Sequence, residues 1–405
     1  MKMIYISQHF PPEIGAAQGR AYDMSKNLVK QGNEVTVLTT FPNDRTCRKV
    51  YQTENVDGIH VKRSFRIKDK KSSAKNRLAN YFSFMLSSIL SGMFTKKPDV
   101  VYATSPQLFV GVAGYVLSRF HRAKFAFEVR DLWVDFAEVL SQFNNKKLLN
   151  LARKLEMFLY KKADIIITVT EGYKEKLIEK GIPADKIEVI TNGVDPDTLP
   201  DNKEASNIKE KYNIQDQFLI LFAGNIGAAQ GLEVVIEAAA ELKNTNKPVV
   251  FMLIGNGVEK KHLQEKATEL QLENVIFVDG MKRSELIQYY QAADVCLVSL
   301  KKHPLFEITI PSKVFDCMGM NVPLLLGVDG EARRIVETNH AGVYFEPENS
   351  DDLVHKVNTI IDQQEVLMEM RKHIRQAVLT KYNRQRLAEK LSSLLEQTTG
   401  TKGNG

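Results

Sequence analysis

The sequence has little cysteine, no long hydrophobic run and no strong excess of charge of one sign. Its three cysteines lie far apart in 405 residues without a C-x-x-C pair, which argues against a disulfide framework or a zinc site and favours a reducing compartment. The first residues, MKMIYISQHF, turn polar too early for a signal-peptide core. A formal net charge of +6 is modest, and no nucleic-acid partner is predicted. We therefore expect a cytoplasmic protein.

Charge is unevenly distributed along the chain. The segment Lys62–Arg77 holds eight Lys or Arg residues against one acid, Asp69, and the segment Leu78–Phe94 that follows has no charge. A basic run beside an amphipathic segment suits an anionic membrane surface. The alternative is a helix packed on a sheet, with a solvated charged loop before it. The membrane interpretation predicts peripheral association with the inner face of the plasma membrane through Lys62 to Phe94.

Short apolar, β-branched runs alternate with helical patterns from residue 3 onward, which is typical of β-α-β units and a parallel sheet. The segment Thr191–Lys203 is rich in Asn, Gly, Pro and Asp, and it predicts a hinge before the pattern restarts. The strands predicted before this hinge are Met3–Ser7, Glu34–Thr39, Val100–Ala103, Lys124–Glu128, Ile165–Val169 and Ile187–Ile190.

A second set of strands follows the hinge. The segment Asp352–Glu396 contains no Pro or Gly and predicts helices, the last of which, from about 380 to 396, packs back on the first domain. The fold class is therefore α/β, with two doubly wound Rossmann-like domains, 1–197 and 198–379, facing across a cleft. The predicted strands of the second domain are Phe218–Phe222, Val249–Ile254, Val275–Val278, Val295–Val298, Leu324–Leu326 and Gly342–Phe345.

Two glycine-containing loops follow the first strand of each predicted domain. QHFPPEIGAAQGR spans Gln8–Arg20, and FAGNIGAAQGLEVVIEAA spans Phe222–Ala239. Backbone amides at a helix start bind phosphate, although turn chemistry alone also explains small residues in such loops. No G-x-G-x-x-G is present, so a dinucleotide site is not predicted. A third turn, LIGNGVEKKHL, places Gly255 and Gly257 after another strand.

The most informative segment is FEITIPSKVFDCMG, Phe306–Gly319. Glu307 is predicted in a loop, Ser312 near a helix start, and Asp316 one turn into that helix. Carboxylates accept hydrogen bonds from sugar hydroxyls, while Lys313 and free helix amides can receive phosphates. A capped helix with a surface Glu and a Lys that extends toward solvent is the alternative.

Over essentially its full length, the chain resembles the retaining glycosyltransferases of family 4, and within them the branch that includes bacterial N-acetyl-L-fucosamine transferases of surface-polysaccharide synthesis. The resemblance implies the GT-B fold. The motifs that carry it are PPEIGAAQGR, FEVRDLW at Phe127–Trp133, NGVD at Asn192–Asp195, GNIGAAQGL, IGNG, and IPSKVFDCMG followed by DGEARRIVE at Asp329–Glu337.

The resemblance implies that Glu307 contacts the donor sugar and that Asp316, an Asp where the family usually has Glu, contacts the ribose. Asn225 and Gln230 stand where the family commonly has an Arg and a Lys for the diphosphate. Lys313 becomes the nearest candidate cation, with Lys301, Arg130 and Arg20 as further ones. The full implied donor-binding set is Gly15, Arg20, Asn225, Gly227, Gln230, Gly231, Gly255, Gly257, Met281, Lys282, Ile308, Pro311, Ser312 and Asp316.

In the first domain, Arg130 takes the place of a family His, with Asp131 beside it. Together with Glu307 and Lys313 they form the predicted catalytic set, although a structural salt bridge is the alternative for the Arg-Asp pair. His9, Gln18 and Trp133 are candidate acceptor contacts, with a loop histidine satisfied by its neighbours as the alternative for His9 and simple packing for Trp133.

The resemblance implies metal-independent, retaining transfer of a sugar from a nucleotide-diphospho donor, a UDP-activated N-acetylated deoxy sugar, to a lipid-linked glycan acceptor in capsule, O-antigen or exopolysaccharide synthesis. No metal or other cofactor is predicted. Two alternatives remain open. One is a UDP-sugar epimerase of the same fold, and the other is a membrane-associated homologue that has lost turnover.

Overall fold

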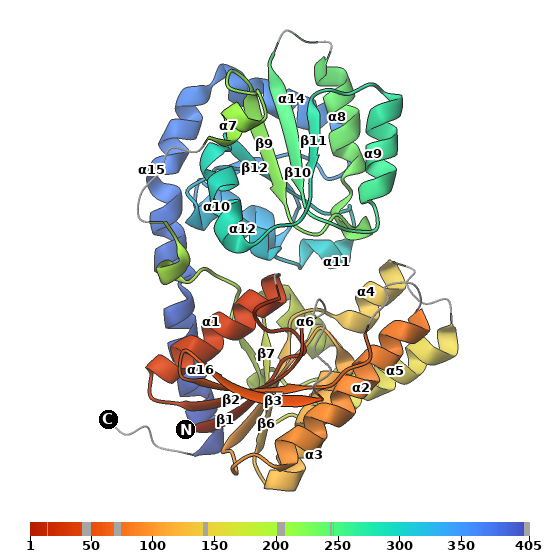
Figure 1. Cartoon of the computed structure of the whole chain (residues 1–405), viewed down its shortest axis with the longest axis vertical. Helices are drawn as coiled ribbons and strands as arrows, with labels where there is room; N and C mark the ends of the chain where they lie inside the picture. Colours follow the sequence, from red (N-terminus) through yellow and green to blue (C-terminus); the bar gives the residue numbers. More distant parts are fainter. Residues whose placement is uncertain are drawn as a thin grey trace. The chain divides into compact units, whose positions relative to one another are not determined.

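The structure of the chain is a computed structural model. It describes residues 1–13, 15–42, 50–68, 74–140, 145–200, 207–243, 245 and 247–400, with the side chains of 74 and 75 excepted. The chain divides into two compact units (Figure 1). Unit 1 comprises Met1–Thr191 and Arg384–Gly405, and unit 2 comprises Asn192–Asn383.

Unit 1 is built on an eight-stranded sheet with the order β3-β4-β2-β1-β5-β6-β7-β8. Neighbouring strands are parallel except for β3, which pairs antiparallel with β4 at the sheet edge. The β-branched and aromatic residues of the central strands are buried on both faces, as parallel sheets require. The strands are β1 (Lys2–Ile6), β2 (Glu34–Thr40), β3 (Tyr51–Val56), β4 (Ile59–Ser64), β5 (Val100–Thr104), β6 (Lys124–Val129), β7 (Ile165–Thr168) and β8 (Ile187–Val189).

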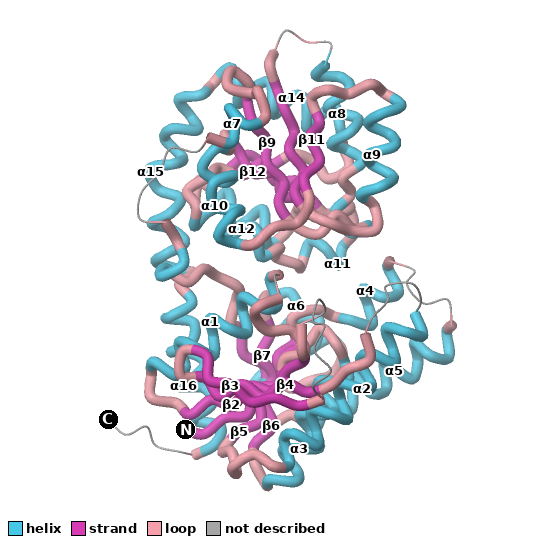
Figure 2. The backbone as a smooth tube through the Cα atoms, viewed as in Figure 1, coloured by secondary structure: helices cyan, strands magenta, loops and turns pink. Residues whose placement is uncertain are grey.

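Helices cover both faces of this sheet (Figure 2). On one face, α1 (Ala16–Lys30) and α16 (Arg384–Thr399) pack against alternate residues of the strands, so that Tyr5 lies in one apolar cluster with Leu391 and Leu395. The other strand residues face α2 (Ala74–Met93), α3 (Leu108–His121) and α5 (Lys146–Lys162). The remaining helices of unit 1 are α4 (Trp133–Val139), α6 (Glu171–Glu179) and η1 (Ala184–Lys186).

Unit 2 has a six-stranded, wholly parallel sheet with the order β11-β10-β9-β12-β13-β14. The strand order reverses between β9 and β12, which is where doubly wound sheets bind ligands at their carboxyl ends. The strands are β9 (Phe218–Ala223), β10 (Val249–Ile254), β11 (Val275–Val278), β12 (Val295–Ser299), β13 (Leu324–Gly327) and β14 (Gly342–Tyr344).

The sheet of unit 2 is also covered on both faces. One face carries α8 (Glu233–Lys243), α9 (Lys260–Glu269) and α14 (Ser350–Asp362), whose apolar residues share a cluster with Phe218, Ile220 and Phe222. The other carries α10 (Arg283–Ala292) and α12 (Ser312–Gly319). The shorter or peripheral helices are η2 (Pro196–Thr198), α7 (Ile208–Lys211), η3 (Ala228–Gln230), α11 (Pro304–Glu307), α13 (Glu331–Thr338) and α15 (Gln364–Lys381).

The predicted α/β class with two doubly wound units is confirmed, and the strands predicted by apolar runs are present with ends that shift by at most one residue. The hairpin formed by β3 and β4 was not predicted. The helix-forming tail is three helices, of which α16 belongs to unit 1. Within the described residues, every helix is too short or too polar to cross a bilayer.

Candidate active site

Four loops at the carboxyl ends of β11, β10, β9 and β12 carry the donor-site residues predicted in unit 2. These four strands are adjacent in the sheet, so their loops follow one another along a single edge. The sequence therefore assigned residues far apart in the chain to the same edge. They are Asn225, Gly227, Gln230 and Gly231 after β9, Gly255 and Gly257 after β10, Met281 and Lys282 after β11, and Glu307, Ile308, Pro311, Ser312, Lys313 and Asp316 after β12.

The loop after β9 is fixed by its own hydrogen bonds. The amide of Gly227 donates to Oε1 of Gln230 at 3.2 Å, and the backbone N–H of Lys301 donates to the carbonyl of Ala229 at 2.9 Å. The Gln230 side chain thus stabilises the turn through this hydrogen bond, whereas the Asn225 side chain is exposed. The two residues therefore differ, because Gln230 bonds within the turn whereas Asn225 is exposed.

Gly255 and Gly257 lie where two loops touch. A Cβ on Gly255 would lie 1.8 Å from the carbonyl oxygen of Gly224, and one on Gly257 would lie 1.9 Å from that of Ile226. Neither contact is possible for a larger residue. The two glycines are explained by close packing of the β10 loop against the β9 loop, and this packing sets the backbone path of the site.

Lys313, in the first turn of α12, extends beneath the β9 loop. Its ammonium lies 3.6 Å from the centroid of the Phe222 ring, and a Cβ on Gly224 would lie 3.0 Å from it. Part of the side chain is accessible, but the nitrogen itself is buried and has no hydrogen-bond partner among the described residues. Burial lowers the pKa of Lys313 to about 7. The site thus contains an unpaired cation in contact with an aromatic face.

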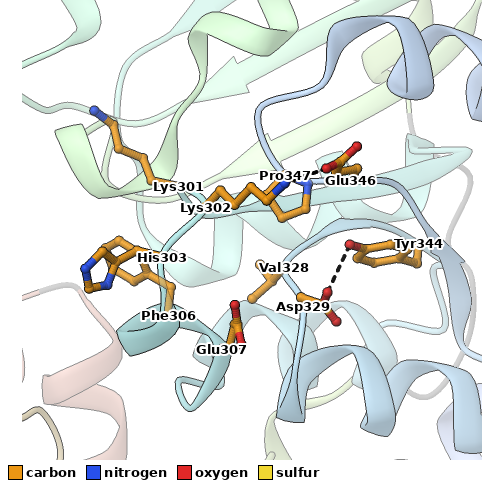
Figure 3. A pocket seen from close by; sticks show the side chains of 10 residues that line it. All are labelled: Lys301, Lys302, His303, Phe306, Glu307, Val328, Asp329, Tyr344, Glu346 and Pro347. Carbon is orange, nitrogen blue, oxygen red and sulfur yellow. Dashed lines mark hydrogen bonds and ion pairs between the residues drawn. The ribbon is translucent and has the colours of Figure 1, made fainter.

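Glu307 ends α11 and lines a pocket of about 320 Å³ formed by the loops after β12, β13 and β14 (Figure 3). Gly330 holds the backbone of Glu307 in place. It adopts φ 72°, and a Cβ there would lie 2.1 Å from the carbonyl oxygen of Glu307. Sequence reasoning noticed the DGEARR motif that contains Gly330 but assigned it no role.

Most polar groups that line this pocket bind one another. The Tyr344 hydroxyl donates to Oδ2 of Asp329 at 3.3 Å, and Lys302 pairs with Glu346 at 2.6 Å. In contrast, the Lys301 ammonium and the Glu307 carboxylate make no hydrogen bond or ion pair within the described part of the chain. Two opposite charges at the pocket are therefore available to a polar ligand.

Asp316 of α12 pairs with Arg283 of α10 at 3.5 Å, with both side chains about one-third exposed. Lys282 precedes α10, is exposed, and makes no side-chain cap. Sequence reasoning missed Arg283, although it directly follows the predicted pair Met281 and Lys282. The carboxylate predicted to bind ribose thus already has a cationic neighbour that orients it.

The prediction that Arg20 binds the donor is wrong. Its side chain has no exposed surface, because Nε and Nη2 donate to Oε1 of Glu128 and Nη1 and Nη2 donate to the carbonyls of Thr191 and Ile190. A guanidinium bonded in this way cannot reach a ligand. Arg20 instead links α1 to β6 and to the residues Ile190 and Thr191 that follow β8.

Arg130 and Asp131 follow β6 and are partly exposed. The backbone N–H of Arg130 donates to the Ser105 hydroxyl at 2.8 Å, while its Nε is buried without a partner. The predicted alternative, a salt bridge between these two residues, is absent from the described structure. Burial raises the pKa of Asp131 to about 6, against the opposing effect of Arg130. Trp133 packs against the small apolar cluster of α4 and α5.

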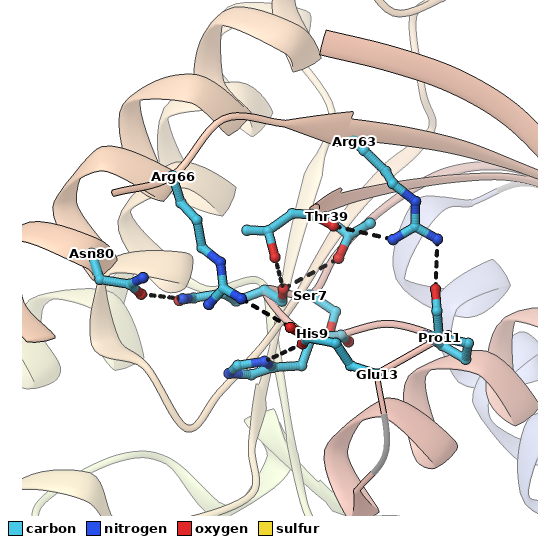
Figure 4. A network of polar contacts seen from close by, with 10 residues as sticks. Ser7, His9, Pro11, Glu13, Thr39, Arg63, Arg66 and Asn80 are labelled. Carbon is cyan, nitrogen blue, oxygen red and sulfur yellow. Dashed lines mark hydrogen bonds and ion pairs between the residues drawn. The ribbon is translucent and has the colours of Figure 1, made fainter. Parts of the chain in front are cut away.

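The loop after β1 is held by a polar network (Figure 4). Glu13 accepts from Arg66 at 2.9 Å and lies 3.1 Å from Nδ1 of His9. His9 is thus satisfied within its loop, in agreement with the alternative interpretation. Gly15 and Gln18 lie at the start of α1, where a Cβ on Gly15 would meet the Gln18 amide at 2.5 Å.

Comparison with known families accounts for nearly all of the chain between residues 17 and 381. Residues 17–198 match the model described as Glycosyltransferase Family 4, and residues 204–381 match the model described as Glycosyl transferases group 1. The two matched ranges meet close to the boundary between the two units.

Individual relatives are distant but extend over most of the chain. The chain is 26% identical over 372 residues to the putative colanic acid biosynthesis glycosyl transferase WcaI of Escherichia coli strain K12, covering 87% of this chain and 90% of that protein. It is 21% identical over 420 residues to the amylovoran biosynthesis glycosyltransferase AmsK of Erwinia amylovora, covering 98% and 100%. The crystal structure of HepE of Anabaena in complex with UDP-glucose has a TM-score of 0.75 at 17% identity, covering 98% of this chain and 100% of that one.

Proposed function

The chain is a glycosyltransferase of the GT-B fold, and we propose that it transfers a sugar from a nucleotide-diphospho donor with retention of configuration and without a metal. The acceptor hydroxyl attacks the anomeric carbon on the face from which the diphosphate departs. The bond from that carbon to the diphosphate oxygen breaks as the new glycosidic bond forms, and the hydroxyl proton passes to the diphosphate. The products are the glycosylated acceptor and a nucleoside diphosphate.

The unpaired ammonium of Lys313 is the observation that carries this proposal. Charge develops on the leaving diphosphate in the transition state, and a cation already in place lowers the barrier because it need not reorganise. Lys313 is held beneath the β9 loop at the carboxyl edge of the sheet, where doubly wound folds bind phosphates. Lys301, at the neighbouring pocket, supplies a second cation.

Glu307 is proposed to orient the donor sugar. Its carboxylate lies at a pocket of about 320 Å³, and a carboxylate can accept hydrogen bonds from two sugar hydroxyls. Asp316 with Arg283 is proposed to contact the ribose. In unit 1, Arg130 and Asp131 are proposed to contact the acceptor.

The donor nucleotide is proposed to be UDP, and the sugar an N-acetylated deoxy sugar. HepE, which shares the fold, binds UDP-glucose, and the resemblance to N-acetyl-L-fucosamine transferases indicates the sugar class. The acceptor is proposed to be a lipid-linked glycan, since relatives are named for the biosynthesis of colanic acid and amylovoran.

A thermal-shift screen against nucleotide sugars tests the donor, because a ligand that binds only the folded protein raises its stability. We expect UDP-sugars to raise the Tm of the native protein, and an N-acetylated deoxy sugar to raise it most. EDTA should leave transfer to a lipid-linked glycan unchanged. Activity that is lost with EDTA and restored by manganese would contradict the metal-free proposal.

Two further measurements separate the alternatives. Conversion of the UDP-sugar without any acceptor would indicate an epimerase. Tight UDP binding by calorimetry, with no transfer to any lipid-linked acceptor, would indicate a homologue without turnover. The absence of family cations at Asn225 and Gln230 is the observation that keeps the second alternative in view.

A further inference from the structure

Helix α2 has an outer face made only of large apolar side chains. Four residues from 76 to 93 are exposed, and they lie four positions apart, at Leu78, Phe82, Leu86 and Leu90. Phe94 continues the series directly after the helix. A spacing of four places side chains in one row along a helix. These five residues, which we name the α2 stripe, are between 37% and 85% exposed.

The segment after β4 widens the stripe. The hydroxyl of Ser87 donates to the carbonyl of Phe65 at 2.6 Å, and the amide of Ile67 donates to the hydroxyl of Ser83 at 2.9 Å. These bonds fasten the segment along α2, and the side chains of Phe65 and Ile67 are themselves exposed. The result is a contiguous apolar surface rather than scattered residues, and such surfaces mark interaction sites.

Most of the exposed charges around this surface are positive, although Lys96 lies 3.8 Å from Glu34. Neither α2 nor α3 contains an Asp or Glu. At the end of the stripe, Lys96 and Lys97 are exposed. The end of α3 lies alongside, because Nε2 of His121 is 3.0 Å from the carbonyl oxygen of Gly92, and it adds three exposed residues. These are Arg119, Phe120 and Arg122.

The basic run Lys62–Arg77 contributes fewer exposed cations to this surface than the sequence predicted. Arg63 and Arg66 are buried and pair with Glu54 and Glu13, respectively, so they face the protein interior. The prediction that the whole run meets a membrane is wrong for these two residues. Lys68 is exposed, whereas Asp69, Lys70 and Lys71 lie outside the described residues.

We propose that the α2 stripe lies in the interface of an anionic lipid bilayer. The helix would lie flat, with its five apolar side chains below the headgroups and the cations near Phe94 beside lipid phosphates. The 16-residue step from Leu78 to Phe94 makes this contact about 24 Å long. The proposal rests on the surface of unit 1 alone and stands apart from the proposed reaction.

Charge favours a bilayer over a protein partner. The exposed cations beside the stripe lie on three different segments, with Lys68 before α2, Lys96 and Lys97 after it, and Arg119 and Arg122 at the end of α3. A surface that is anionic throughout complements all of them without a fixed arrangement of carboxylates. The hydroxyls of Ser83 and Ser87 that flank the stripe are already bonded inside the unit, so they have no hydrogen left to donate to a protein partner.

Vesicle flotation of the full chain tests this proposal. The probes are vesicles of phosphatidylcholine alone and of phosphatidylcholine mixed with phosphatidylglycerol. We expect the native chain to float with the anionic vesicles and to be released by salt. The double substitution Leu86→Ser/Leu90→Ser should weaken binding by roughly ten-fold or more, because it removes apolar side chains from the interface. Lys96→Gln/Lys97→Gln should weaken binding to anionic vesicles alone.

Val258→Ser/Leu270→Ser is the matched control, because both side chains are exposed and apolar but lie in unit 2. This variant should bind as the native chain does, and all variants should keep the native Tm. Failure of the native chain to float, or equal flotation of the stripe variant, would overturn the proposal. Sedimentation as a dimer that Leu86→Ser/Leu90→Ser dissociates would assign the stripe to a second copy instead. Equal binding to neutral vesicles would overturn the role of the cations.

Discussion

The ammonium of Lys313 lies 3.6 Å from the centroid of the Phe222 ring, at a buried position where it has no hydrogen-bond partner among the described residues. The π face offsets part of the cost of removing the charge from water. It does not replace an anion, and the pKa of Lys313 is accordingly lowered to about 7. In the proposed function, a bound diphosphate would supply the counter-ion that this ammonium lacks.

Replacing Lys313 with methionine should lower kcat/KM by about 10²–10³-fold, the usual effect of removing one preorganised group that meets transition-state charge. The measurement is the rate of sugar transfer to a lipid-linked acceptor. Lys247→Met is the control, because Lys247 precedes β10 at the opposite edge of the same sheet and pairs with Asp362. Equal losses in the two variants would remove Lys313 from the proposed mechanism.

The pH profile of kcat/KM should fall as the pH rises through about 7. In the free enzyme Lys313 loses its proton near that pH, and only the charged form attracts the diphosphate. Lys313→Arg retains its charge at every accessible pH, so its profile should lack this limb even if its activity is lower. An unchanged limb in the arginine variant would show that another group titrates.

Breaking the buried pair of Arg20 and Glu128 should lower the free energy of unfolding by about 3–5 kcal/mol, because the remaining charge is left without its partner in the core. Urea denaturation of Arg20→Met and of Glu128→Gln measures this loss. The variant that carries both changes should lose less than the sum of the single losses. We expect the variants to lose stability while the protein that remains folded binds the donor with unchanged affinity. A rise in donor KM without any loss of stability would instead place Arg20 in the donor site.

Asp131 should make stability depend on pH. Burial raises its pKa to about 6 in the folded chain, so the folded state binds more protons than the unfolded state between the ordinary aspartate pKa and about 6. The free energy of unfolding contributed by this group is therefore highest below that window and falls as the pH rises through it. Asp131→Asn should flatten this part of the curve, as measured by urea titrations from pH 4 to 7. Parallel curves for both proteins would contradict the assignment.

The strands of both sheets were predictable because parallel strands buried on two faces need unbroken apolar runs. The runs at Val249–Ile254 and Val275–Val278 match β10 and β11 from end to end. The edge strand β3 escaped prediction because its four middle residues, Gln52–Asn55, are all polar and none of its six residues is buried. The Asp57-Gly58 turn between β3 and β4 was the signal that could have revealed the hairpin.

The candidate site was predictable as far as its loops, because loop position follows from strand order. The direction in which a side chain points does not follow from strand order. Arg20 looked like a phosphate ligand in a loop-to-helix segment, but its partner Glu128 lies 108 residues further along the chain. Gly330 was missed for the same reason, since its contact with Glu307 depends on how two separate loops meet.

The position of helix α16 in the chain affects the order in which the two units can fold during translation. Leu391 and Leu395 fill the core of the unit whose first strand is Lys2–Ile6, and Arg384 pairs with Asp23 of α1. Unit 1 therefore cannot be completed until the residues of α16 have been translated, while Asn192–Asn383 emerges before them as one continuous stretch. Because domains fold as units as they emerge, unit 2 can reach its native state before unit 1 does.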